Sequence, residues 1–365
     1  MLNLTTIDLR ILLCFIFAGG ITFFLIPSIV EIAQKKSLFA DPGMRTSHLK
    51  SIPNLGGIAI FIGFIISYLL FIKTTDFPAF QFLIAGGFIL FFIGFKDDIT
   101  QISPFKKFFG QVIAAWLVVS FGGIRLTNLH GFFGIYEMQE SISYMLSMIT
   151  VIGITNCFNL MDGIDGLSAG LGILSSLAFG IWFYLVGDFD WVMIASGLCG
   201  SLLTFSFFNV FGNTNKIFMG DTGSLTLGFM ISVIAIHFNQ MNINPDIPYH
   251  IYAAPAVSIG ILLIPIFDTL RVILFRLIHR KSPFNADKTH IHHYLIDLGL
   301  SHLNATLVLL GLNILFIIIA FLLKDLSVLM ALIILLTLGL VKYIITIYLA
   351  RKKRQKTSRL SLQHR

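Results

Sequence analysis

The stretch NCFNLMDGIDGLSAG, residues 156–170, places two amides and two carboxylates inside a largely apolar sequence. Asn156, Asn159 and Asp162 recur at a spacing of three residues, which brings them near one face of a helix. Two glycines flank Asp165 and loosen the backbone beside it. Because a carboxylate that faces hydrocarbon is costly, we expect these side chains to meet water, a cation or a polar ligand at a membrane face.

The composition around this stretch is that of a membrane protein. Of the 365 residues, 56% are hydrophobic and only 12% are charged, whereas a soluble domain has about a quarter charged. The fold class predicted is an all-α polytopic integral membrane protein with about 10 or 11 transmembrane helices, at roughly 17 to 25 apolar residues per span. The spans centre near Ile21, Ile62, Phe88, Ala115, Ile149, Leu177, Leu198, Phe229, Ile264, Ile314 and Leu335.

The basic residues predict the orientation of these spans. An odd number of spans places the termini on opposite faces, and the Lys/Arg-rich tail at 351–365 predicts a cytoplasmic C-terminus and an outer N-terminus. Roughly twenty of the 25 basic residues then lie inside. We therefore expect a single multi-span domain over residues 1–350, followed by a basic cytoplasmic tail over 351–365.

With this topology, the unusual polar motifs share the cytoplasmic face. They lie near 97–98, 156–165, 213–221 and 279–302. A secondary transporter, the alternative from another functional class, would instead have polar residues near the bilayer midplane and on both faces. A non-catalytic membrane scaffold would not explain why the Asp and Asn residues cluster. The net charge of +7 indicates topology and attraction to anionic lipid and phosphate, not nucleic-acid binding.

Two acidic motifs each have a structural and a functional interpretation. Asp97 and Asp98 either form a solvated helix end, or share a cation or act as a base; Lys107, ten residues after Asp97, suits an anionic substrate. In FMGDTGS, residues 218–224, Asp221 is either an N-cap or an oxygen ligand for Mg²⁺ beside a backbone that approaches phosphate closely.

A histidine cluster, His290, His292 and His293, lies in the segment SPFNADKTHIHHYL. Zinc is disfavoured because its sites use a closed, regularly spaced set of Cys or His ligands. Contact with phosphate or sugar is favoured over zinc, with a solvated loop as the structural interpretation.

Together, these motifs resemble the polyprenyl-phosphate N-acetylhexosamine-1-phosphate transferase family, whose bacterial members start cell-envelope glycans on undecaprenyl phosphate. The resemblance extends from about Arg45 to His293 and rests on DD, NxxNxxDGxDGL, FMGDTGS and HxHH, which occur in family order. It implies an active site at the cytoplasmic face of a bacterial inner membrane, reached by undecaprenyl phosphate and a UDP-N-acetylhexosamine. A homodimer is compatible with the apolar outer surface.

The resemblance also implies roles for residues that match the family motifs. Asp97 and Asp98 match an acidic pair that deprotonates or positions the lipid phosphate, and Lys107 matches a lysine that contacts phosphates. Asn159 and Asp221 match the ligands of Mg²⁺, with Mn²⁺ as an alternative. The implied substrate-binding residues are Asn156, Asp162, Gly163 and Asp165 around the nucleotide, Phe218 on the uracil, and His290, His292 and His293 near the sugar and pyrophosphate.

The details of two motifs indicate the branch. The run HIHH, and Thr100 and Gln101 after Ile99, resemble the branch that transfers N-acetylglucosamine 1-phosphate, giving undecaprenyl-pyrophosphoryl-sugar and UMP in the first membrane step of a cell-envelope polysaccharide. The alternative branch is the phospho-N-acetylmuramoyl-pentapeptide transferase of peptidoglycan synthesis. Gln101 occupies the last position of the usual DDxxD, so the role of that acid has no counterpart here.

Overall fold

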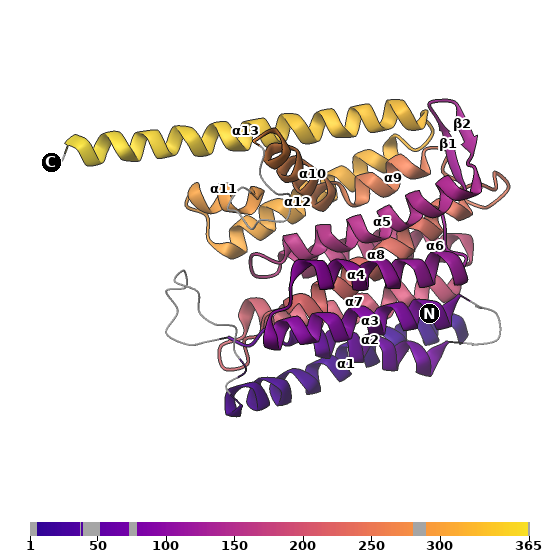
Figure 1. Cartoon of the computed structure of the whole chain (residues 1–365), viewed down its shortest axis with the longest axis horizontal. Helices are drawn as coiled ribbons and strands as arrows, with labels where there is room; N and C mark the ends of the chain where they lie inside the picture. The colour runs from indigo at the N-terminus through magenta and orange to yellow at the C-terminus, as the bar shows by residue number, and fades with distance from the viewer. Residues whose placement is uncertain (1–5, 37, 39–51, 73–78, 280–289, 364–365) are drawn as a thin grey trace, which may run out of the picture.

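The structure is a computed structural model, which describes residues 6–36, 38, 52–72, 79–279 and 290–363. Five of the basic residues predicted to lie in the inner loops fall outside the described residues: Arg45, Lys50, Arg280, Lys281 and Lys288. The described chain is a bundle of helices with one small hairpin (Figure 1). The helices are α1 (Thr6–Lys35), α2 (Gly56–Phe71), α3 (Phe80–Thr100), α4 (Pro104–Trp116), α5 (Glu140–Met161), α6 (Leu167–Val186), α7 (Phe189–Phe211), α8 (Gly220–Met241), α9 (Ala254–Ile261), α10 (Leu263–Ile278), α11 (Ile291–Asp297), α12 (His302–Leu322) and α13 (Val328–Gln363), with a π-helical turn η1 (Leu117–Phe121) after α4.

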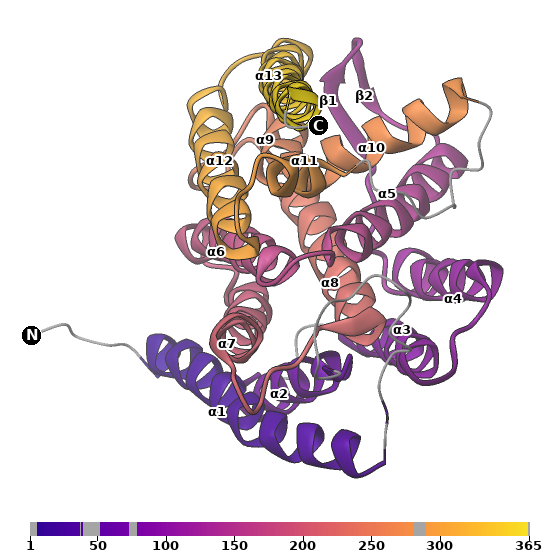
Figure 2. The ribbon, with the colours of Figure 1, turned by 90° about the vertical axis from the view of Figure 1, so that its left-hand side faces the viewer.

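The helix α8 lies at the centre of the bundle and contacts α2, α3, α5, α6 and α9 (Figure 2). Its sequence alternates large apolar residues with small ones, and small residues let neighbouring backbones approach closely. At Gly228, for example, an added Cβ would lie 2.7 Å from the Cα of Thr155 on α5. The central position brings the first turn of α8, which carries Asp221, within reach of several other helices.

The all-α polytopic class is confirmed. Every predicted span centre lies on a helix, and the start of α1 and the end of α13 lie at opposite ends of the bundle (Figure 1). Within the described residues, seven helices are long and apolar enough to cross a membrane, or eight if α9 and α10 form one bent span. That number is lower than the 10 or 11 predicted from hydropathy, partly because α2 and α4 are only 16 and 13 residues long.

The span predicted around Ile264 is broken, with an 82° bend between α9 and α10. The break has a local cause, since Pro265 has no N–H to donate to the carbonyl of Ile261, four residues earlier. That carbonyl instead accepts a hydrogen bond from Asn313 Nδ2 of α12, at 3.2 Å. The bend directs α10 away from the bundle axis and alongside α5 (Figure 2).

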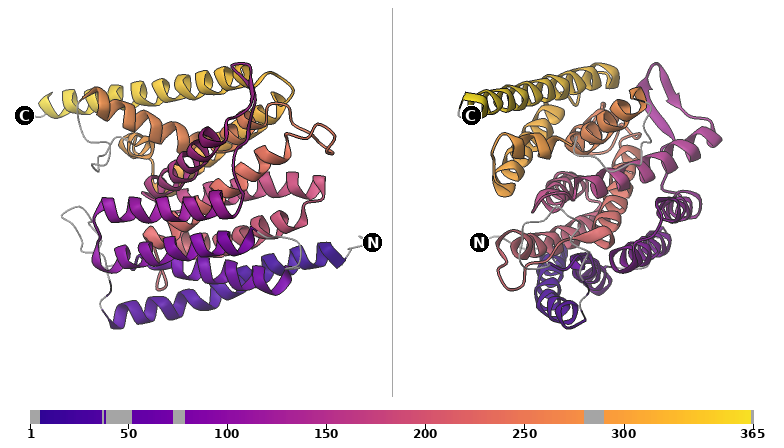
Figure 3. Two further views of the ribbon diagram at one scale, coloured as in Figure 1. Left: turned by 45° about the vertical axis from the view of Figure 1, so that its right-hand side comes forward. Right: turned by 60° about the vertical axis from the view of Figure 1, so that its left-hand side comes forward.

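Two further features add to the sequence-based expectation. The loop between η1 and α5 contains an antiparallel hairpin, β1 (Asn128–Phe132) and β2 (Ile135–Glu137), beside the first turns of α13 (Figure 3). Residues 351–363 of the predicted basic tail are helical, because α13 continues as one helix through residue 363. The C-terminal third of α13 therefore extends beyond the bundle (Figure 1).

Candidate functional site

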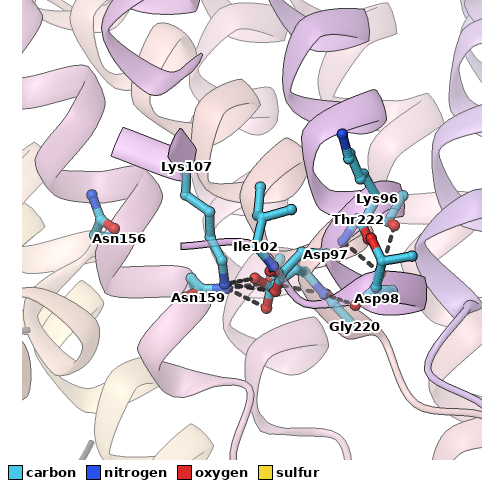
Figure 4. A network of polar contacts seen from close by, with 12 residues as sticks. Lys96, Asp97, Asp98, Ile102, Lys107, Asn156, Asn159, Gly220 and Thr222 are labelled. Carbon is cyan, nitrogen blue, oxygen red and sulfur yellow. Dashed lines mark hydrogen bonds and ion pairs between the residues drawn. The ribbon is translucent and has the colours of Figure 1, made fainter. Parts of the chain in front are cut away.

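Four helices each place one polar side chain in a single cluster at one end of the bundle (Figure 4). Lys107 of α4 forms ion pairs with Asp97 of α3, where Nζ lies 2.7 Å from Oδ2, and with Asp221 of α8. Asn159 of α5 donates from Nδ2 to Asp221 Oδ1 at 3.0 Å and to Ser224 Oγ at 2.9 Å. The side chains predicted for catalysis and metal binding thus include four that the fold brings into direct contact.

Asp98 does not form a pair with Asp97, although the two are adjacent in sequence. The oxygens of Asp98 accept hydrogen bonds from the backbone N–H groups of Asp221 and Thr222, at 2.7 and 2.9 Å, and from Thr222 Oγ1 at 2.6 Å. Its carboxylate therefore caps the first turn of α8, where negative charge is favoured. Asp97 instead turns toward Lys107 and accepts the N–H of Ile102 at 2.6 Å. The geometry supports a role for Asp98 in holding Asp221, not in sharing a cation with Asp97.

Gly220 makes this cap sterically feasible. Its φ of +69° lies in the left-handed region, and an added Cβ would lie 2.1 Å from the carbonyl oxygen of Asn54 and 2.7 Å from both oxygens of Asp98. We expect Gly220→Ala to lower the unfolding free energy by about 3 kcal/mol, from conformational strain plus overpacking, and to reduce activity by displacing Asp221. The thermal unfolding midpoint in detergent measures the loss of stability.

A matched control for this prediction is Gly187→Ala. Gly187 has a similar φ of +83°, but an added Cβ would meet nothing within 4 Å. We expect this variant to lose only the conformational part, about 1 kcal/mol. Equal destabilisation of the two variants would contradict the proposed crowding at Gly220.

A cavity of about 910 Å³ lies beside the polar cluster. Nine of the predicted site residues line it: Asp97, Lys107, Asn156, Asn159, Asp162, Gly163, His290, His292 and His293. Asp221 reaches the cluster through Lys107 and Asn159. The cavity also has an apolar wall, which includes Phe108, Leu160, Leu270 and Ile273 from α4, α5 and α10.

The histidine motif approaches the DGxDG motif directly. A Cβ on Gly163 would lie 2.6 Å from Nε2 of His292, so the glycine leaves room for this imidazole. His292 is buried, and burial together with neighbouring His293 lowers its pKa to about 3, so the ring is neutral. Its Nδ1 has no hydrogen-bond partner among the described residues. A buried, unpaired ring nitrogen at a cavity suits a polar ligand.

Two residues predicted to bind the nucleotide, Asp165 and Phe218, do not line this cavity. Asp165 forms an ion pair with Lys216, with Oδ2 2.6 Å from Nζ. Their segments lie side by side, because Asn209 accepts the N–H of Gly166 at 2.7 Å and donates to the carbonyl of Ile217 at 2.9 Å. The fold therefore places these two predicted residues in adjoining segments, next to the cavity but outside its lining.

The structure adds polar residues that the sequence-based reasoning missed. Gln111 exchanges amide hydrogen bonds with Asn156 at 2.7 and 3.2 Å, and Ser224 accepts from Asn159. Arg276 of α10 also lines the cavity. Asp268 contacts the histidine motif. The signal was available for Gln111 and Asp268, since a polar residue inside an apolar segment indicates a function by default.

The oxygen atoms of the polar cluster fit the requirements of Mg²⁺. Within the described part of the chain, no group of three or more His, Cys, Asp or Glu side chains could hold a metal ion. Mg²⁺ does not need such a cage, because it usually retains waters and binds one or two protein oxygens together with substrate phosphates. The carboxylate of Asp221 and the amide oxygen of Asn159 meet this requirement, and the nearby carboxylates outnumber the single ammonium of Lys107.

Asp162, in the turn that follows α5, carries a buried carboxyl group that should make the stability of the fold depend on pH. Burial, together with the neighbouring carboxylates of Asp221 and Asp98, raises the pKa of Asp162 from 3.8 to about 8. A carboxyl group whose pKa is higher in the folded than in the unfolded protein stabilises the fold at pH values below its unfolded pKa. This contribution is lost as the pH rises through about 8. In metal-free buffer, the thermal unfolding midpoint should decrease as the pH is raised from 6 to 9. It should decrease less steeply in Asp162→Asn. Equal slopes would contradict the prediction.

Comparisons with known proteins follow the same motifs. Residues 80–239 match the model of glycosyl transferase family 4. The chain is 32% identical to a Bacillus subtilis protein named "Probable undecaprenyl-phosphate N-acetylglucosaminyl 1-phosphate transferase", over 88% of this chain and 87% of that protein. It is 30% identical to the undecaprenyl-phosphate α-N-acetylglucosaminyl 1-phosphate transferase of Yersinia pestis, over 82% and 79%. It is also 30% identical to a decaprenyl-phosphate N-acetylglucosaminephosphotransferase of Mycolicibacterium smegmatis, over 80% and 77%.

Proposed function

The chain belongs to glycosyl transferase family 4, and from this membership we propose that it transfers N-acetylglucosamine 1-phosphate from UDP-N-acetylglucosamine to undecaprenyl phosphate. The products are undecaprenyl-pyrophosphoryl-N-acetylglucosamine and UMP. The names of the relatives support the transferred group and the polyprenyl acceptor. The observation that carries the proposal is the cluster of Lys107, Asp97, Asp221 and Asn159 at a cavity that also contains three histidines.

The cavity suits two substrates of different character. Its polar lining, with Lys107 and the three histidines, can bind the phosphates and sugar of the donor. Its apolar wall between α4, α5 and α10 can receive the prenyl chain of the acceptor. The lipid phosphate would then lie next to the donor pyrophosphate, and this placement supplies much of the catalysis in a phosphoryl transfer.

In the proposed reaction, a phosphate oxygen of the lipid attacks the sugar-side phosphorus of the donor. One P–O bond forms, the P–O bond to the UMP phosphate breaks, and UMP leaves. Lys107 neutralises charge that moves onto phosphate oxygens. A phosphate monoester is already largely ionised near pH 7, since its second pKa is about 6. Asp97 therefore positions Lys107 and the lipid phosphate more than it acts as a base.

We propose that Asp221 and Asn159 hold Mg²⁺, with Mn²⁺ as the alternative ion. When bound, the ion would offset negative charge on the phosphate oxygens of both substrates. Asp98 contributes indirectly, because its cap on α8 orients the backbone that carries Asp221.

The setting follows from the same reasoning. We propose a multi-pass protein of a bacterial inner membrane, with the site, the histidine motif and the extended end of α13 on the cytoplasmic side. The basic residues that follow α13's apolar part support this orientation. The apolar outer surface also accommodates a homodimer.

The experiment that tests the function is lipid labelling by the purified protein in detergent, with undecaprenyl phosphate, Mg²⁺ and radiolabelled UDP-N-acetylglucosamine. We expect label in the lipid fraction and none when the acceptor is left out. A parallel reaction contains labelled UDP-N-acetylmuramoyl-pentapeptide. Label from this donor alone would assign the protein to the peptidoglycan branch. Absence of lipid label from either donor, and from other UDP-amino sugars, would favour a transporter or a scaffold.

A further inference from the structure

Asp268 is a buried carboxylate on α10 that the proposed reaction does not use directly. It is only 3% exposed and lies in the apolar run LIPIFDTLRVILF, residues 263–275. A buried charge of this kind needs partners. Asp268 has three: Nδ1 of His290 at 2.8 Å, the backbone N–H of Ile291 at 3.0 Å, and Nη2 of Arg271 at 3.1 Å.

These contacts hold the start of the histidine motif at two points. One oxygen of Asp268 contacts the imidazole of His290, and the other accepts the backbone N–H of the next residue, at the start of α11. On the far side, the guanidinium of Arg271 lies 4.4 Å from the ring centroid of Tyr343 on α13. The carboxylate thereby links α10, α11 and α13, which lie together in Figure 2.

The pairing determines which nitrogen of His290 faces the cavity. An ionised carboxylate only accepts hydrogen bonds, so Nδ1 of His290 must carry a proton. The other nitrogen, Nε2, is then the one available to a ligand in the cavity that His290 lines. His292 lies nearly parallel, with ring centroids 5.7 Å apart, but its Nδ1 has no partner among the described residues. Of these two stacked rings, His290 is the one held by a carboxylate.

We infer that Asp268 is a positioning residue, which fixes the ring and tautomer of His290 so that Nε2 bonds a phosphate oxygen of the sugar nucleotide. This inference rests on the proposed function. In metal sites, removing a carboxylate that orients a histidine ligand lowers metal affinity or activity roughly 10- to 100-fold. The same logic of a buried Asp holding the Nδ1 of a His applies to other catalytic histidines.

The test is a double-mutant cycle in the purified, full-length protein, with turnover and KM measured for UDP-N-acetylglucosamine. We expect Asp268→Asn to lower kcat 10- to 100-fold while KM changes less than about threefold. In a His290→Ala background, the same change should alter kcat less than about threefold, because the group that it positions is already gone. Equal losses in both backgrounds would overturn the inference, as would near-normal kcat in Asp268→Asn.

The chain offers a matched control at another Asp–His pair. Asp188 Oδ2 lies 2.8 Å from Nε2 of His237, outside the cavity lining. We expect Asp188→Asn to keep kcat within about twofold of the unmodified protein. A loss equal to that of Asp268→Asn would show that removing either Asp–His pair has this effect, and would overturn the specific role.

One further variant separates positioning from packing. Asp268→Glu keeps the charge and the acceptor, so it should retain more turnover than Asp268→Asn; equal loss in both would indicate packing alone. If the unmodified protein transfers no label to lipid, the proposed function fails first. If it does transfer label and Asp268→Asn is unimpaired, only the positioning role fails.

Discussion

Asp221→Asn is expected to lower lipid labelling by about 10³-fold, the upper range for removing one electrostatic group from a site of this kind. Asp221 has contacts from three directions, since it pairs with Lys107, accepts from Asn159 and donates its backbone N–H to Asp98. The amide keeps the shape of the side chain but removes its charge. The ion pair with Lys107 and the proposed Mg²⁺ ligand are lost together.

The measurement is labelled product per minute at saturating UDP-N-acetylglucosamine, with undecaprenyl phosphate and Mg²⁺ present. Asp246→Asn is the matched control, because Asp246 is an exposed residue in the loop after α8. Its turnover should stay within about twofold of the unmodified protein. Both variants should be recovered from membranes in similar amounts. Turnover above about a tenth of normal in Asp221→Asn would remove Asp221 from the proposed site.

Replacing Lys107 by Met should lower turnover by 10²- to 10³-fold. The ammonium lies between two carboxylates, 2.7 Å from Asp97 Oδ2 and in contact with Asp221. Met keeps much of the length of the side chain but leaves these carboxylates to repel each other. Arginine should restore only part of the activity, because a planar guanidinium does not replace a compact ammonium between two carboxylates.

The neighbouring lysine provides the control for this prediction. Lys106 differs from Lys107 by one position in sequence, but it is exposed and is not part of the cavity lining. Lys106→Met should therefore keep turnover within about threefold. Similar losses in the two variants would indicate a general effect of basic charge on lipid binding, and would contradict a specific role for Lys107 at the phosphates.

The sequence predicted the class of the fold and most of the composition of the site. Apolar runs of membrane length require helices, because every backbone polar group in lipid must be paired within the span. The same reasoning placed a helix at each predicted span centre. It did not predict the break before α10. That break depends on one proline and on a side-chain amide from α12, and the contact with α12 cannot be read from the local sequence.

The site residues divide in a similar way. Asn156 and Asn159 share a cavity because their spacing of three places them near one face of α5, and Asp162 follows directly at the end of that helix. Phe218 and Asp165 were predicted to bind the nucleotide. Their positions depend on how the loop before α8 packs against the turn after α5.

What the sequence by itself determined is therefore the membrane-spanning class, the types of polar group in the candidate site and their order along the chain, because hydropathy and motif spacing are local properties. Only the tertiary structure decided the partners of those groups. Asp97 and Asp98 are adjacent in sequence, but Asp97 pairs with α4 and Asp98 accepts hydrogen bonds from α8. Asp268 contacts His290, which lies 22 residues further along the chain. The physical reason is that side-chain pairing depends on which helices approach closely, and that approach is set by long-range packing around α8.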